Sequence, residues 1–196
     1  MHMKKGEATK EHLIACAGRL FWQNGYAATG LSEILKEAHL TKGSFYFYFK
    51  SKEDLAVAVV GYYHRVVYEW LAGFAADADW ETFVTHFTGA MLDGARKGEH
   101  YGCPIAVVGM ELAFSHKAIA GVYMEAMEEM EGLFGQVLVA SGLPPGQAAP
   151  LAGRLFAIYE GNLLLYRMSK DVSYIEKLKE QLLATYWEYQ QRKDRI

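Results

Sequence analysis

The 196-residue chain has little of what marks several protein classes. It has two cysteines, Cys16 and Cys103, far apart and without CxxC spacing, so we expect neither a disulfide framework nor a zinc site. No apolar run approaches the roughly 18 residues that a membrane-spanning helix needs, and the first residues lack the apolar core of a signal peptide. These absences predict a cytoplasmic protein with no membrane partner and no metal.

Motifs of the common enzyme classes are also missing. The sequence contains no GxxxxGK[ST] phosphate loop, no GxSxG nucleophile elbow, no HExxH and no GxGxxG. His100 and Cys103 are the nearest thing to a metal pair, and two ligands beside a glycine turn do not make a site. We therefore expect a protein that is not an enzyme and that carries no cofactor.

The charge is unevenly distributed along the chain, whose net charge is −3. Residues 1–52 contain eight Lys and Arg against four Glu, whereas the remainder contains twelve against nineteen acidic residues. A basic head on an acidic body suggests that only the head meets an anionic partner.

Apolar residues recur at helical spacing almost throughout, so the predicted fold class is all-α. Thr29 is a candidate N-cap for a short helix that reaches Ala38, and Thr41 is a candidate N-cap for the next one. Ser51 and Asp54 form a variant of the capping box at the start of a long helix. Besides the short helix that reaches Ala38, helices are expected at about 9–24, 41–49, 52–75, 80–97, 104–114, 116–141, 147–169 and 172–192.

Five aromatic residues in a row, Phe45 to Phe49, fit either a strand or a helix. A lone strand would have no partner to pair with, and an isolated strand is not stable, so we predict a helix. At 100° per residue Phe45 and Phe49 form the buried edge, while Phe47 points away from the core. Exposing that much aromatic surface indicates a docking site.

Residues 9–55 resemble the helix-turn-helix DNA-binding head of TetR-family bacterial transcriptional regulators. The resemblance rests on Ala17-x-x-Leu20-Phe21-x-x-x-Gly25-Tyr26, Thr29-x-Leu31-x-x-Ile34-x-x-x-Ala38, Thr41-Lys-Gly-Ser-Phe-Tyr-Phe-Tyr-Phe49 and Lys52-x-x-Leu55. His39 stands where the family usually has glycine, and histidine tolerates positive φ better than most residues. The implied domains are a DNA-binding head at 1–52 and an effector-binding and dimerisation body at 53–196.

The resemblance implies double-stranded operator DNA as a partner and a role for each matching residue of the head. Tyr46, Tyr48 and Lys52 would bind phosphates or base edges, Lys42 suits guanine, and Phe47 offers only apolar contact. The alternative is that the aromatic residues pack on the body or on a partner subunit. The full set of expected DNA contacts is Thr29, Thr41, Lys42, Gly43, Ser44, Tyr46, Phe47, Tyr48 and Lys52.

Two later segments, 102–113 and 160–171, are similar to the LmrA-like subgroup of the same family. This similarity implies a homodimer formed through the last two helices. Burial of these helices against their own body is the alternative. The expected interface residues, which share helical spacing, are Leu151, Leu155, Ile158, Leu165, Leu178, Leu182, Tyr186 and Tyr189.

The same subgroup implies a pocket for a small-molecule effector in the body. Large apolar side chains, with Glu111, Asn162 and Glu160 as polar anchors, are the candidates, although each apolar one could equally be core. The candidate ligand-binding residues are Trp70, Phe87, Met91, Val107, Met110, Glu111, Phe114, Tyr123, Met127, Tyr159, Asn162 and Tyr166.

The sequence thus predicts a dimeric repressor that a small hydrophobic or amphipathic effector releases from a palindromic operator. Two alternatives stay open. One is a regulator that responds to no ligand, or that is switched by oxidation of Cys103. The other is a helical small-molecule-binding protein without DNA function.

Overall fold

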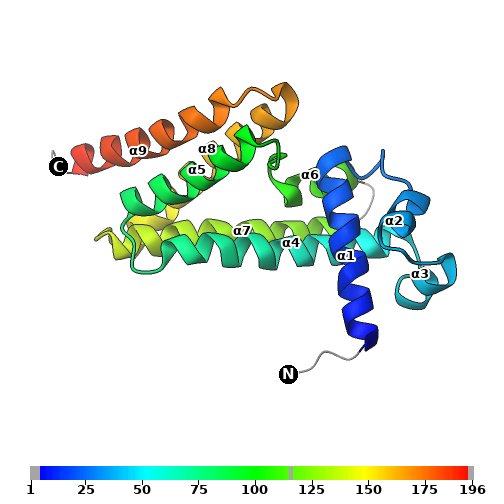
Figure 1. The fold of residues 1–196 in the computed structure, drawn as a ribbon. Helices are drawn as coiled ribbons and strands as arrows, with labels where there is room; N and C mark the ends of the chain where they lie inside the picture. Colours follow the sequence, from blue (N-terminus) through cyan, green and yellow to red (C-terminus); the bar gives the residue numbers. More distant parts are fainter. Residues whose placement is uncertain (1–4, 115–116, 194–196) are drawn as a thin grey trace. The chain divides into compact units, whose positions relative to one another are not determined.

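The computed structural model describes residues 5–114 and 117–193, and within them the chain is all-helical (Figure 1). The helices are α1 (Lys5–Asn24), α2 (Leu31–Glu37), α3 (Lys42–Tyr48), α4 (Lys52–Ala75), α5 (Trp80–Arg96), α6 (Pro104–Leu112), α7 (Lys117–Ala140), α8 (Pro145–Ser169) and α9 (Ser173–Lys193). The predicted fold class is therefore confirmed. The expected start of the seventh helix at residue 116 lies outside the described residues.

The helices group into two compact units. The head unit comprises residues 1–67 and 104–126, and the body unit comprises residues 68–103 and 127–196. This division differs from the expected boundary after residue 52, because α6 and the first part of α7 group with the head unit rather than with the body unit. Both α4 and α7 contribute residues to the two units.

The head unit is built around apolar faces of α1 to α4. Leu13 and Phe21 from α1 are fully buried, as are Ile34 from α2, Phe45 from α3 and Leu55 from α4. These positions are the ones at which helical spacing predicted apolar faces. Their burial removes apolar surface from water, which is the main favourable contribution to folding.

The turn between α2 and α3 has the hydrogen bonds of a Schellman motif. The N–H of His39 donates to the carbonyl oxygen of Lys36 at 3.2 Å, and the N–H of Leu40 donates to that of Leu35 at 2.9 Å. His39 adopts a φ of 53°, which confirms the expectation that histidine takes the left-handed conformation that glycine usually takes here.

Helix capping agrees in part with the sequence. Thr41 caps α3, because its side-chain oxygen accepts a hydrogen bond from the N–H of Ser44 at 3.2 Å. Ser51 accepts from the N–H of Asp54 at 3.2 Å, as a capping box requires, but the Asp54 carboxylate accepts from Lys50 rather than from Ser51. The predicted Thr29 cap is wrong, since the N-cap of α2 is Gly30.

The body unit contains a cluster of aromatic rings between α5, α7 and α8. The Phe134 ring lies at its centre, with centroids 5.4 to 6.1 Å from five others. Those five belong to Trp80, Phe83, Phe87, Phe156 and Tyr159. Helices α8 and α9 form a hairpin whose turn begins at Lys170 in the left-handed conformation, with a φ of 62° (Figure 1).

Candidate nucleic-acid interface

Helix α3 buries one edge and exposes the other. Phe45 and Phe49 lie in the head core, whereas Tyr46 is 60% exposed and Phe47 is 80% exposed. Tyr48 is half-buried. The helical interpretation of the aromatic run is therefore confirmed, and two large rings face solvent on one short helix.

Polar residues accompany these rings at the start of α3. Thr41, Lys42 and Gly43 are exposed and Ser44 is half-buried. The hydroxyl oxygens of Thr41 and Ser44 are 3.1 Å apart and share a hydrogen bond. The surface thus offers hydroxyl donors and acceptors, one ammonium group and two aromatic rings, which are the groups that read base edges and bind phosphates.

Thr29 does not join this surface. Its side chain is fully buried, and its hydroxyl donates to the carbonyl oxygens of Gly25 at 2.7 Å and Leu20 at 3.3 Å. The expectation of a DNA contact from Thr29 is wrong, because the hydroxyl is occupied in closing the turn between α1 and α2. The spacing of Thr29 from the following apolar residues is that of an N-cap, although the N-cap of α2 is Gly30.

Lys52 also occupies a different position from the one expected of a free phosphate ligand. Its Nζ donates to the carbonyl oxygen of Tyr26 at 2.6 Å and lies 4.1 Å from the centroid of the Tyr26 ring. Burial lowers the pKa of the Lys52 ammonium, and the nearby Glu53 and Glu111 carboxylates partly offset that effect. A phosphate contact would require the ammonium to share or exchange its Tyr26 partner.

Glu111, expected in an effector pocket, binds the turn between α1 and α2 instead. Its two carboxylate oxygens accept hydrogen bonds from the backbone N–H groups of Tyr26 and Ala27. Both carboxylate oxygens of Glu111 are therefore occupied within the head unit in this structure. Sequence reasoning missed this contact because nothing in the spacing links residues 85 positions apart.

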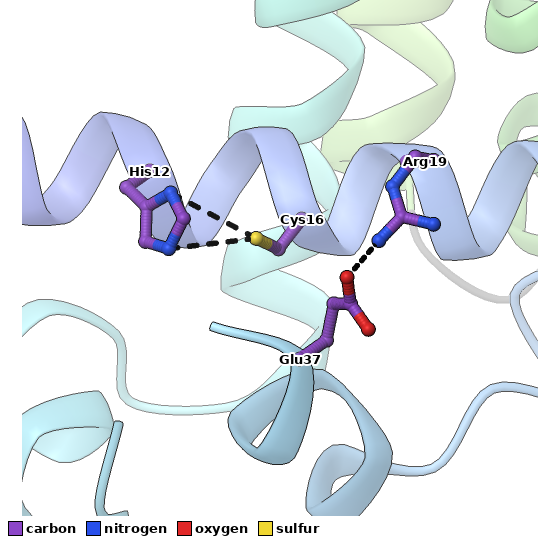
Figure 2. A network of polar contacts seen from close by, with 4 residues as sticks. All are labelled: His12, Cys16, Arg19 and Glu37. Atoms are coloured by element: carbon purple, nitrogen blue, oxygen red, sulfur yellow. Dashed lines mark hydrogen bonds and ion pairs between the residues drawn. The ribbon is translucent and has the colours of Figure 1, made fainter. Parts of the chain in front are cut away.

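A polar network on α1 and α2, in which Cys16 is buried and Arg19 and Glu37 are exposed, completes the head (Figure 2). The Arg19 guanidinium pairs with the Glu37 carboxylate and so links α1 to α2. On the same face of α1, the Cys16 sulfur lies 3.7 Å from Nε2 of His12 (Figure 2). Burial raises the pKa of the Cys16 thiol, Glu37 raises it further and Arg19 lowers it, so the uncharged thiol is favoured.

Two family models match this chain. One, described as bacterial regulatory proteins of the tetR family, matches residues 13–59. The other, described as the C-terminal domain of LmrA/YxaF-like transcriptional regulators, matches residues 81–181. The chain belongs to the TetR family. The predicted resemblance, including its LmrA-like subgroup, is confirmed, and relatives in this family are transcriptional regulators rather than enzymes.

Individual TetR-family proteins are similar over different lengths. The uncharacterized regulator YxaF of Bacillus subtilis is 29% identical over 180 residues, covering 89% of this chain and 93% of that protein. The transcriptional repressor NemR of Escherichia coli is 44% identical over 63 residues, 32% of each chain. A TetR-family regulator from Cytophaga hutchinsonii has the same fold, with a TM-score of 0.82 at 22% identity over 94% of this chain and 96% of that one.

The candidate effector residues of this TetR-family chain are divided between the two units. Val107, Met110, Phe114 and Tyr123 belong to the head unit, and within it Met110 and Phe114 are exposed. In the body unit Trp70 is exposed, whereas the remaining candidates are packed inside. Those packed candidates are Phe87, Met91, Met127, Tyr159, Asn162 and Tyr166.

Asn162 and Tyr166 use their polar atoms within the body unit. The Asn162 amide donates to the carbonyl oxygen of Ile158 at 2.9 Å and to the side chain of Gln181 at 2.7 Å, which links α8 to α9. The Tyr166 hydroxyl donates to the carbonyl oxygen of His100 at 2.9 Å. Asn162 thus serves the fold in this structure rather than offering a free amide to a ligand.

Most of the expected interface residues lie in the core of the body unit. Five of them are buried within their own chain, so the prediction that they face a partner is wrong. These five are Leu151, Leu155, Leu178, Leu182 and Tyr186. Ile158 and Tyr189 are half-buried, and Leu165 is exposed. The exposed apolar residues of α8 and α9, which we call the α8–α9 apolar face, are Leu164, Leu165, Met168 and Trp187.

Cys103 is buried next to a carboxyl group. It is only 5% exposed, and its thiol is hydrogen-bonded with the side chain of Glu160. Burial raises the pKa of Glu160 to about 7, and the bond with Cys103 partly opposes this. A thiolate at this position would lie beside a second acidic group and away from water, which disfavours the reactive form of cysteine.

No helix in residues 5–114 or 117–193 has the length and apolar character needed to cross a bilayer.

Proposed function

We propose that the chain is a homodimeric repressor that binds a palindromic operator and is released from it by a small hydrophobic or amphipathic effector. The observation that carries the proposal is the solvent-facing side of α3, where Tyr46 and Phe47 stand beside Lys42 in a helix-turn-helix. Helices of this kind enter the major groove with their N-terminal residues against base edges.

Dimerisation is supported by the α8–α9 apolar face. Met168 is 74% exposed and Trp187 is 44% exposed, and such side chains are unusual on a free surface when they share one helical hairpin. A second copy of the same face would cover them, since two-fold dimers pair identical surfaces. Two heads would then bind half-sites roughly 34–36 Å apart.

The test is selection of binding sites from a random duplex pool at physiological salt. A dimeric reader recovers two half-sites related by two-fold symmetry, separated by about one helical turn. Recovery of a single half-site would argue against the dimer. A pool without enrichment would argue against sequence-specific DNA binding and favour a helical small-molecule-binding protein instead.

Release by an effector requires that the effector bind the DNA-incompetent arrangement more tightly. The Cys103 redox alternative is less well supported, since the thiol is buried beside Glu160. Loss of operator binding under oxidant in the wild type, but not in Cys103→Ser, would restore that alternative.

A further inference from the structure

The backbone turn after α1 presents two successive N–H groups that one side chain binds. Oε1 of Glu111 accepts from the N–H of Tyr26 at 3.0 Å, and Oε2 accepts from the N–H of Ala27 at 2.6 Å. A carboxylate held by two backbone donors is a charge-assisted pair of bonds, stronger than neutral ones. Glu111 lies in the last turn of α6, so this contact joins α6 to the DNA-binding head.

Gly25 makes room for the carboxylate. Its φ is 95°, and a Cβ built there would lie 2.8 Å from Oε1 of Glu111. The backbone conformation favours glycine here, and a larger residue would displace the Glu111 carboxylate from its present position.

Tyr26 connects the same turn to the start of α4. Its carbonyl oxygen accepts from Nζ of Lys52 at 2.6 Å, and its hydroxyl donates to Oε1 of Glu53 at 3.1 Å. The residue is thus bound through its N–H by α6, and through its carbonyl and hydroxyl by α4. Burial, followed by the Glu53 hydrogen bond, raises the pKa of Tyr26 to about 12, so the hydroxyl stays a donor.

The position of Glu111 is unfavourable for α6 taken alone. A negative charge in the last turn of a helix faces the negative end of the helix dipole. The two N–H groups of the turn compensate for this repulsion. The placement indicates that the carboxylate serves the head rather than its own helix.

We propose that Glu111 is a positioning residue for DNA binding, which holds the turn between α1 and α2 and so fixes the setting of α2 and α3. This inference rests on the proposed function, because the positioned helix is the DNA reader. Glu111 touches no DNA in this proposal. It acts through Tyr26 and Ala27.

The sign of its effect separates positioning from simple electrostatics. DNA is a polyanion, so deleting a negative charge near the head should strengthen binding if charge alone mattered. Loss of a positioning contact should weaken binding instead, because the head must then be ordered on the operator. Glu111→Gln keeps the size of the side chain, but it offers one acceptor oxygen and turns an NH₂ donor towards a backbone N–H.

The experiment compares wild type, Glu111→Gln and Glu125→Gln on the operator recovered from the pool. Glu125 is an exposed glutamate of α7, so its variant controls for the loss of one negative charge. We expect Glu111→Gln to weaken operator binding about tenfold, because two charge-assisted bonds to the turn are lost. The slope of affinity against salt concentration should stay as in the wild type, because no phosphate contact is lost. Glu125→Gln should bind equally well or more tightly.

Amide hydrogen exchange provides a measurement independent of DNA. The N–H groups of Tyr26 and Ala27 should exchange at least about tenfold faster in Glu111→Gln than in the wild type, since they lose a bonded acceptor. Unchanged exchange, unchanged or tighter operator binding by Glu111→Gln, or loss of helical structure in both units would each overturn the inference. A wild-type protein that binds no DNA would overturn the proposed function and this inference together, whereas faster exchange would still support the contact itself.

Discussion

The head and the body use aromatic residues in opposite ways. On α3 of the head, Tyr46 and Phe47 are exposed and neighbour polar residues. In the body, the rings around Phe134 are packed against one another and closed to solvent. The same residue types thus form an exposed surface in one unit and a core in the other, and helical phase decides which.

The difference teaches that aromatic content alone does not locate a ligand site. Phe87 and Tyr159 looked suited to an effector pocket, yet their rings contact Phe134 at the centre of a packed cluster. Exposed aromatic rings lower solubility unless a partner molecule covers them, whereas buried rings are already covered by neighbouring side chains. The following predictions test this contrast.

The largest effect is expected at the centre of the body cluster. Phe134→Ala should lower the free energy of unfolding by about 3–5 kcal/mol, because it removes a fully buried ring and leaves a cavity. Chemical denaturation followed by circular dichroism measures the change. A loss of less than 1 kcal/mol would mean that the cluster is loosely packed and could open to a ligand.

A second effect concerns the buried carboxyl of the body. The folded-state pKa of Glu160 is raised to about 7, above the usual value of 4.5, so the wild type should lose stability as the pH rises from about 4.5 to 7. Glu160→Gln should remove this loss and be more stable than the wild type at pH 8, by up to about 3 kcal/mol, and nearly equal at pH 4.5.

His100 acts in the opposite direction, and the comparison must allow for it. Burial lowers the pKa of His100 to about 4. The stability of the fold that depends on the neutral imidazole is therefore lost as the pH falls from about 6.5 to 4. This loss occurs in both proteins and cancels when Glu160→Gln is compared with the wild type at each pH. Equal stabilities of the two proteins at pH 8 would contradict the burial of the charged carboxylate.

Lys52 combines an internal contact with a position in the head, since its Nζ lies over the ring of the buried Tyr26. Lys52→Ala should lower stability by about 1–2 kcal/mol through loss of the bond to the Tyr26 carbonyl. It should also reduce the salt slope of operator binding by about one unit, if the ammonium moves to a phosphate in the complex. Denaturation and salt titration of binding measure these separately. An unchanged slope would restrict Lys52 to its internal contact.

The smallest effect on stability is expected on the exposed side of α3. Phe47→Ala should change the free energy of unfolding by no more than about 0.5 kcal/mol, because the ring is 80% exposed. The same variant should weaken operator binding by about 1–2 kcal/mol through loss of apolar contact. A variant that binds the operator normally would remove Phe47 from the interface.

Local patterns predicted much of the fold. The aromatic run could be assigned to a helix because no partner strand existed elsewhere in the sequence. His39 could be placed at positive φ because the TetR family usually has glycine at this position and histidine tolerates that conformation. Both inferences depend on neighbours in the chain, and sequence carries that information directly.

Contacts between distant residues could not be predicted in the same way. Helical spacing identified Leu155 and Leu178 as apolar positions, but not whether their own chain or a second copy would bury them. The bond from Glu111 to the turn after α1 left no trace in composition or spacing. Its only signal is an acidic residue at the wrong end of a short helix.

The rotation along α6 determines the direction in which the Glu111 side chain points. Helix α6 lies within the head unit, and near its end Glu111 accepts hydrogen bonds from the backbone N–H groups of Tyr26 and Ala27. Its nine residues rise about 13 Å, and each residue turns the helix by about 100°. Inserting or deleting one residue before Glu111 would therefore rotate the carboxylate away from its two N–H partners. The number of residues in α6 that precede Glu111 therefore matters for this contact, independently of which side chains they carry.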